Sequence, residues 1–250
     1  MILNPEYLYY ICIILITRLF FQFRDDPLAL RRAVYKTLAE SIALLIFAWN
    51  YWLAVIFLLI IILNISSLLL EKKSSRLKLF RLILLFIYAI SFAFLFSSKT
   101  NIHFNHSLIS LFFSFEKSFV LIAFLRQLDW IYFLVVFTGF LLVLNEANIF
   151  IRYLMESLHL VPQLKISRKE EAIDTQEYNR GRVIGILERV LIYFFVLSNH
   201  YSAVGFILAA KGITRFKELE NREFAEYFLI GTLLSSIVSG AVALLIKGLI

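Results

Sequence analysis

The chain has 250 residues, of which 61% are hydrophobic, and it carries a formal net charge of +7. Because soluble domains contain only about 45–50% apolar residues, this composition excludes a soluble fold. The basic excess is typical of the cytoplasmic loops of a membrane protein and does not indicate a nucleic-acid partner. The single cysteine, Cys12, excludes an internal disulfide. We therefore expect an all-α polytopic bundle, embedded among lipids in the inner (plasma) membrane.

Apolar runs divide the chain into about eight predicted membrane spans, because several of them approach or exceed the ~18 residues that cross a bilayer. In chain order they cover residues 7–23, two spans within 37–70, 82–97, 119–144, 183–197, 203–212 and 224–246. Most of the 25 lysines and arginines fall in four segments between these spans. The positive-inside tendency places those segments in the cytoplasm, so both termini are expected outside.

Two of the turns between spans are predicted to be tight hairpins. In the run 37–70 the sequence FAWNYWLAV places the turn residue Asn50 between the interfacial residues Trp49 and Trp52. Basic loops flank this run on both sides, which favours two helices over the alternative of one long tilted helix. The second hairpin is expected at SNHYS, residues 198–202.

These spans give three parts. Residues 1–144 hold the N-terminal membrane helices, residues 145–182 form a cytoplasmic loop, and residues 183–250 hold the C-terminal membrane helices. The loop is the most polar stretch of the chain and mixes charges of both signs.

Motifs of soluble enzymes, of phosphate-binding loops and of zinc proteases are missing from the sequence. His103 and His106 have a spacing that fits metal ligands, but two histidines in a loop do not make a site. No catalytic residue, metal site or cofactor is therefore predicted.

Charged residues near one predicted membrane boundary form the candidate site. Glu188 and Arg189 lie inside an apolar run and point about 100° apart on a helix, so each needs a partner on another helix. We expect Glu188 to meet Lys211 or Arg215, and Arg189 to meet Glu226 or a helix-end carbonyl. Two interpretations stay open, because such a cluster can be an ion-pair lattice that fixes the helices or a polar pocket for a ligand.

Small residues four positions apart predict close helix packing in the same region. These residues are Gly181, Gly185, Gly231, Ser235 and Ser239.

Two charges of the N-terminal half are interpreted as less important. Arg18 is expected to snorkel towards the membrane surface, and Glu40 to complement a helix dipole.

The order of residues in this region resembles a family of uncharacterised bacterial polytopic membrane proteins, known as a domain of unknown function. The similar stretches are GRVIGILER at 181–189, AAK at 209–211 with RF at 215–216, and EYFLIGT at 226–232. The resemblance covers about 179–236 and implies a helical membrane bundle with important C-terminal motifs, but no known substrate. In the N-terminal half, FQFRDDP and RQLDWIYF stand where the family tends to carry an acid with glutamine, or histidine with aspartate.

Three functions fit these features. A small-solute or ion transporter or channel would use the charged cluster near the cytoplasmic boundary. A membrane scaffold would dock a cytoplasmic protein through the 145–182 loop, or assemble as a homo-oligomer. An intramembrane enzyme acting on lipid head groups would need a nucleophile or metal set that the sequence does not display.

Overall fold

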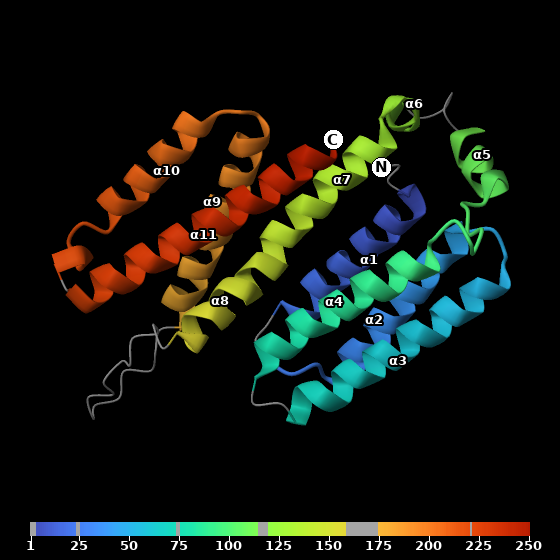
Figure 1. Ribbon diagram of the computed structural model, residues 1–250, viewed down its shortest axis with the longest axis horizontal. Helices are drawn as coiled ribbons and strands as arrows, with labels where there is room; N and C mark the ends of the chain where they lie inside the picture. The colour runs from blue at the N-terminus through green and yellow to red at the C-terminus, as the bar shows by residue number, and fades with distance from the viewer. Residues whose placement is uncertain (1–3, 24–25, 74–75, 115–119, 159–174, 221) are drawn as a thin grey trace. The chain divides into compact units, whose positions relative to one another are not determined.

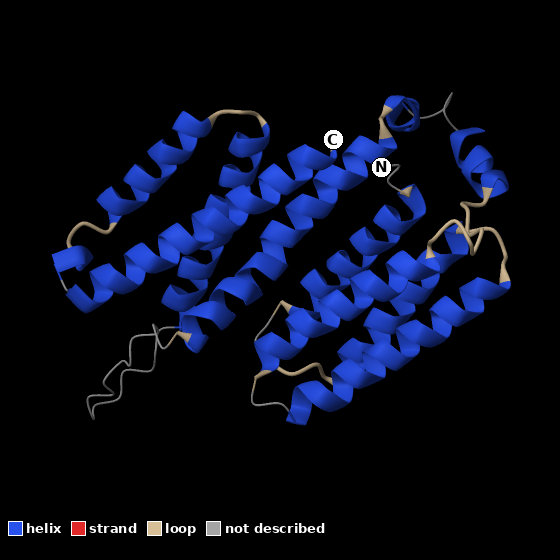
Figure 2. Ribbon diagram, viewed as in Figure 1, coloured by secondary structure: helices blue, strands red, loops and turns tan. Residues whose placement is uncertain are grey.

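The computed structural model describes residues 4–23, 26–73, 76–114, 120–158, 175–220 and 222–250. Within these ranges the regular structure is helical, and one isolated β-bridge joins Phe47 to Phe104 (Figure 2). The all-α expectation is confirmed. The chain divides into an N-terminal unit, Met1–Leu141, and a C-terminal unit, Leu142–Ile250.

The N-terminal unit is a bundle in which α1 packs against α2, α4 and α7, while α3 packs against α2 and α4 (Figure 1). Its helices are α1 (Pro5–Gln22), α2 (Leu30–Ile42), the short 3₁₀ turn η1 (Ala43–Ile46), α3 (Tyr51–Lys73), α4 (Leu77–Leu95), α5 (His106–Ser114), α6 (Val120–Gln127) and α7 (Trp130–Leu141). Asn4 caps α1, because its side chain accepts a hydrogen bond from the backbone N–H of Tyr7.

The C-terminal unit is built around its last helix, α11, which packs against α8 and α9, while α10 packs against α9 (Figure 1). Its elements are the π-helical turn η3 (Leu142–Glu146), α8 (Ala147–Ser157), α9 (Thr175–Leu197), α10 (Tyr201–Thr214), the 3₁₀ turn η4 (Glu218–Glu220) and α11 (Arg222–Leu249).

The expectation of eight spans is wrong. In the part of the chain that the structure describes, four helices are long and apolar enough to cross a membrane: Tyr51–Lys72, Leu77–Leu95, Trp130–Ser157 and Phe224–Leu249. The other predicted spans fail for physical reasons. Helices α2 and α10 have only 13 and 14 residues, whereas a crossing needs about 20, and α1 and α9 carry charges inside their apolar runs.

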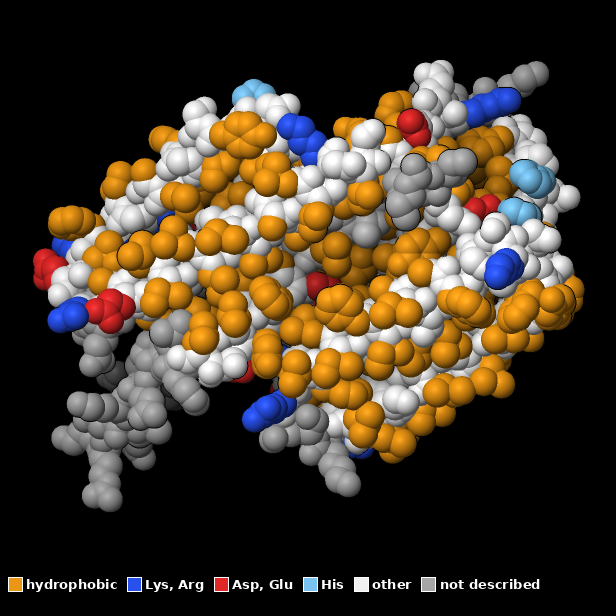
Figure 3. Space-filling view, viewed as in Figure 1, with side chains coloured by type: hydrophobic (Ala, Val, Ile, Leu, Met, Phe, Trp, Pro, Cys, Tyr) orange, Lys and Arg blue, Asp and Glu red, His pale blue; other side chains and the backbone are white. Residues whose placement is uncertain are grey.

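Three of the four candidate spans present most of their apolar side chains outward, whereas 61% of the window in Trp130–Ser157 is buried. Only about a third of the most apolar window of α3 is buried, and 22% of that in α11. Hydrophobic side chains cover much of the helices in the space-filling view (Figure 3). Because soluble proteins rarely expose apolar surface on this scale, these helices indicate a location in a membrane.

The turns of both predicted hairpins are found, but among the helices that flank them only α3 is a candidate span. Between η1 and α3 the helix is broken at residues 47–50, and the side chain of Asn50 donates a hydrogen bond to the carbonyl of Thr100 at 2.9 Å. Between α9 and α10 the chain turns within three residues, and Asn199 adopts a φ of 62°. Asparagine tolerates this left-handed conformation better than most residues do.

The predicted loop at 145–182 begins later than expected. Residues up to Ser157 are helical. The helix that begins at Trp130 continues through η3 into α8, over the apolar run WIYFLVVFTGFLLVLNEANIFIRYLMES. Helix α9 begins at Thr175. The core of the predicted loop, residues 159–174, lies outside the described residues.

Candidate functional site

A cavity of about 770 Å³ lies among α8, α9, α10 and α11 of the C-terminal unit. We call it the charged cavity, because six charged side chains line it. They are the cations Arg152, Arg182, Lys211 and Arg215 and the acids Glu156 and Glu188. Isoleucine, phenylalanine and methionine side chains form much of the remaining wall. Its volume is in the range of small-molecule sites, and its described lining has two more positive than negative charges.

The charged cavity lies at the ends of two candidate spans. The C-terminal turns of α8 meet the N-terminal turns of α11, and an added Cβ at Gly231 would lie 3.8 Å from the terminal methyl of Met155. Membrane-crossing helices end where hydrocarbon gives way to head groups and water. The charged side chains of the cavity therefore lie towards the ends of candidate spans and not at their middles.

Glu188 and Lys211 form the central ion pair of the charged cavity. The Nζ of Lys211 donates to Oε2 of Glu188 at 2.5 Å, which confirms the predicted pairing of these residues. Lys211 also lies over the ring of Phe228, at 5.5 Å from its centroid, and the Arg215 guanidinium lies 5.9 Å from the ring centroid of Phe224. These cation–π contacts hold Lys211 of α10, and Arg215 directly after that helix, against α11.

Arg189 lies behind the wall of the charged cavity and is buried. Its Nε donates to the carbonyl of Val143 at 3.4 Å, and its Nη2 donates to Oδ1 of Asn148 at 3.3 Å. Val143 belongs to the π-helical turn, where the shifted hydrogen-bond register exposes carbonyls that an α-helix would occupy. Asn148 lines the cavity, so Arg189 orients a polar group of the site without facing the ligand space.

Of the two partners predicted for Arg189, Glu226 is wrong, and a backbone carbonyl is found, although it belongs to the π-helical turn η3 and not to a helix end. Glu226 instead accepts a hydrogen bond from Nε of Arg222 at 2.9 Å, one helical turn earlier on the same helix. Both side chains are exposed, by 89% for Arg222 and 62% for Glu226. The carboxylate of Glu226 raises the pKa of Arg222 through this hydrogen bond. Glu226 therefore stands outside the cluster that the sequence predicted.

The predicted packing residues occupy different surroundings. Ser235 and Ser239 are buried on α11, and Gly231 approaches Met155. Gly181 lines the charged cavity, and a Cβ added there would meet no atom within 4 Å. A Cβ added at Gly185 would meet only the side chain of Arg189, at 3.5 Å. Gly231 and the two serines fit the small-residue packing rule, whereas Gly181 leaves space in the cavity.

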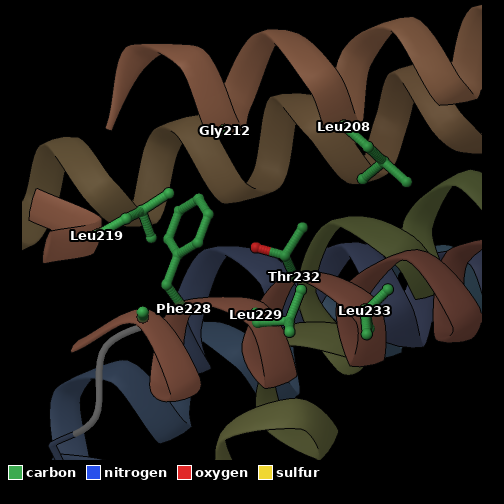
Figure 4. A pocket seen from close by; sticks show the side chains of 8 residues that line it. Leu208, Gly212, Leu219, Phe228, Leu229, Thr232 and Leu233 are labelled. Atoms are coloured by element: carbon green, nitrogen blue, oxygen red, sulfur yellow. The ribbon is translucent and has the colours of Figure 1, made fainter. Parts of the chain in front are cut away.

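A second cavity, of about 340 Å³, lies between α10, η4 and α11. We call it the apolar cavity. Leucine and alanine side chains, Phe228 and Thr232 form most of its wall. The side chains of Phe228 and Thr232 on α11 and of Leu208 on α10 point into the space between the two helices (Figure 4). Phe228 and Thr232 also line the charged cavity, so the two cavities share a wall.

The N-terminal unit holds a buried charge network that the sequence analysis missed. Its first part, the Lys36 cluster, joins Lys36 to Glu40 at 2.7 Å, to Asn64 Oδ1 at 2.6 Å and to the Tyr88 hydroxyl at 3.3 Å. Glu40 also accepts from Thr17 at 2.7 Å and from the Asn64 amide at 2.7 Å. An ammonium has three N–H donors, and here three acceptors meet them.

The second part, the Arg81 cluster, is centred on Glu71. Its Oε2 accepts from Arg81 at 2.9 Å and from the backbone N–H of Leu28 at 2.9 Å, and its Oε1 accepts from Gln22 and Ser67, each at 2.9 Å. Both side chains of the ion pair are buried. A carboxylate with four donors in a dry interior is a structural tie between four segments of the bundle.

These clusters correct two interpretations of the sequence. Arg18 does not snorkel, because it is fully buried and donates to the Arg81 carbonyl at 3.1 Å. Glu40 does more than complement a dipole, because it is fully buried and pairs with Lys36. The helical spacing of polar residues carried this signal, since Asn64, Ser67 and Glu71 fall on one face of α3.

Geometry separates the roles of the two units. The Lys36 and Arg81 clusters are buried, whereas charged side chains of the C-terminal unit line a cavity even where they also pair, as Lys211 does with Glu188. No group of three or more His, Cys, Asp or Glu side chains that could hold a metal ion occurs among the described residues. The charged cavity is therefore the candidate functional site. Comparisons of the chain with protein-family models, with curated proteins and with solved structures find no match.

Proposed function

We propose that the chain is an integral membrane protein of the inner (plasma) membrane that binds a small anionic solute in the charged cavity and conveys it across the bilayer. The observation that carries this proposal is the lining of the cavity, with four cations against two acids at the ends of candidate membrane spans.

The chemistry of the lining favours a phosphate or carboxylate group. Arginine presents a planar fork of donors that matches both anions, and Arg152, Arg182 and Arg215 all reach the cavity wall. Lys211 adds a compact positive charge, held between Glu188 and the ring of Phe228. An entering anion would compete with Glu188 for Lys211, so binding and release would both involve this pair.

Interrupted helices around the cavity favour transport over simple binding. Helix α10 rises only about 21 Å, which is less than the ~30 Å of hydrocarbon, and it ends at the cavity. The π-helical turn η3 interrupts the regular helix beside Arg189. Transporters commonly build solute sites from such short or broken helices. The scaffold alternative, and with it a cytoplasmic protein partner, depends on the loop 145–182, whose core, residues 159–174, lies outside the described residues.

Uptake by vesicles tests the proposal directly. The full chain in phosphatidylcholine vesicles is expected to give saturable uptake of radiolabelled orthophosphate, and Lys211→Met with Arg215→Gln is expected to lower it about tenfold or more by removing two ligand charges. Lys217→Gln is the matched control, because Lys217 is exposed just beyond α10 and does not line the cavity. Absence of both orthophosphate binding and uptake, or equal loss in the control, would contradict the proposal.

Glu188→Gln gives a test with the opposite sign. Removing the carboxylate that holds Lys211 lowers the competition for this cation, so the affinity for orthophosphate is expected to rise about fivefold, or ~1 kcal/mol. Glutamine keeps an oxygen that can accept from Lys211, and the pair is not fully buried, so the fold is expected to persist. Calorimetric titration of the protein in nanodiscs measures the change. Unfolding without any gain in affinity would instead favour the ion-pair lattice.

A further inference from the structure

We infer that the ligand of the charged cavity is a membrane amphiphile, with an anionic phosphate or carboxylate head and a hydrocarbon chain that enters the apolar cavity. This inference rests on the proposed function, because it names the class of anion that the same site would bind. It adds a second binding region, the space between α10, η4 and α11.

The shared wall of the two cavities is the first argument. Phe228 and Thr232 line both spaces, and the Lys211 ammonium lies 5.5 Å from the Phe228 ring centroid. A head group bound at Lys211 would therefore have its attached chain beside Phe228. A free inorganic anion would use only the charged side of this wall, and the apolar side would remain without a role.

The exposure of the apolar cavity is the second argument. Leu229 and Leu233 line it, yet they expose 57% and 48% of their surfaces. Both residues belong to the candidate span Phe224–Leu249, whose exposed apolar side chains would face lipid in a membrane. The apolar cavity therefore opens towards the hydrocarbon, and a chain can enter it from the bilayer without crossing water.

Gly212→Leu is the decisive variant, because Gly212 lines the apolar cavity and an added Cβ there would meet no atom within 4 Å. Room for a Cβ lets a leucine side chain extend into the cavity, and the change removes no charge. Gly205→Leu is its matched control on the same helix, since a Cβ there also meets nothing and Gly205 lines neither cavity. Both changes suit a helix, so both proteins are expected to fold.

The probe is phosphatidic acid with a photoreactive diazirine in one acyl chain, at low fraction in phosphatidylcholine nanodiscs that contain the full chain. Photolabelling is expected on peptides of α10 and α11, and Gly212→Leu is expected to lower it about tenfold, a loss that needs only a few missing chain contacts. Gly205→Leu is expected to retain it. Orthophosphate affinity, measured in parallel, is expected to stay unchanged in both variants.

The two measurements separate the inference from the function beneath it. If orthophosphate binds but Gly212→Leu leaves photolabelling at the level of Gly205→Leu, the ligand is a free anion and the inference is overturned. If neither orthophosphate nor phosphatidic acid binds at the charged cavity, the proposed function itself fails. Labelling by a phosphatidylcholine of the same chain, at the same level, would also overturn the inference, because the anionic head would then play no part.

Discussion

Glu71→Ala is expected to lower the free energy of unfolding by about 3–5 kcal/mol, the range found when one partner of a buried ion pair is removed. The change leaves the Arg81 guanidinium buried beside an empty site, and it also removes acceptors from Gln22, Ser67 and the Leu28 backbone. Each buried donor left without a partner adds its own desolvation penalty. The Arg81 cluster ties segments from α1 to α4, so the loss is expected to affect the whole N-terminal unit.

Glu226→Ala provides the matched control, because it breaks another Arg–Glu hydrogen bond of the same 2.9 Å length. That pair is exposed on α11, where water and salt screen the attraction, so its loss is expected to change stability very little. Unfolding of both variants in detergent micelles, followed by circular dichroism during titration with dodecyl sulfate, measures the difference. Equal small losses would show that the Arg81 cluster is hydrated and does not hold the bundle.

Composition and turn residues predicted the class of fold well. A chain with 61% hydrophobic residues must place apolar surface in lipid, and Asn50 and Asn199 mark breaks that helices cannot easily continue through. Both features are local, so they can be recognised without knowledge of tertiary contacts. The number of spans, by contrast, depends on tertiary contacts as well as on local sequence. Apolar runs such as 203–212 look like spans in sequence, yet in the structure they form a short helix packed on its neighbour.

The sequence predicted only part of the candidate site, because the rest depends on tertiary contacts. The pair Glu188–Lys211 follows from the rule that a charge inside an apolar run needs a partner, and few cations were within reach. For Arg189 the sequence offered Glu226 or a helix-end carbonyl, and the partner found is a backbone carbonyl within a π-helical turn, whose position no residue pattern marks. The cavity itself depends on how α10 stands away from α11, which no residue pattern encodes.

The buried network of the N-terminal unit has a signal in the sequence. Arg18 and Gln22 are four residues apart on α1, as are Lys36 and Glu40 on α2. Polar residues at such helical spacing within apolar helices indicate a face that meets other polar faces. Taken alone, each residue fits a snorkelling or capping charge, and only the joint pattern identifies the bundle interior.

Lys36 and Glu40 allow a test of whether the N-terminal charges serve folding or transport. Either Lys36→Met or Glu40→Gln alone is expected to destabilise the protein by about 3 kcal/mol or more, because each leaves a single buried charge. The double variant carries no charge there, and the glutamine amide at position 40 can still accept from Thr17 or Asn64. It is therefore expected to be more stable than either single variant, with a coupling of about 2–3 kcal/mol.

Vesicle uptake of the double variant completes this test. Because the described contacts of the Lys36 cluster satisfy its donors within the protein, removing both charges is expected to leave orthophosphate uptake close to that of the original chain. The same vesicles with Lys211→Met and Arg215→Gln are expected to lose uptake while the protein stays folded, since the Glu188 carboxylate that loses Lys211 is not fully buried. Suppose instead that the double variant folds and yet loses uptake. The Lys36 cluster would then belong to the solute or proton path, and the assignment of the functional site to the C-terminal unit alone would be wrong.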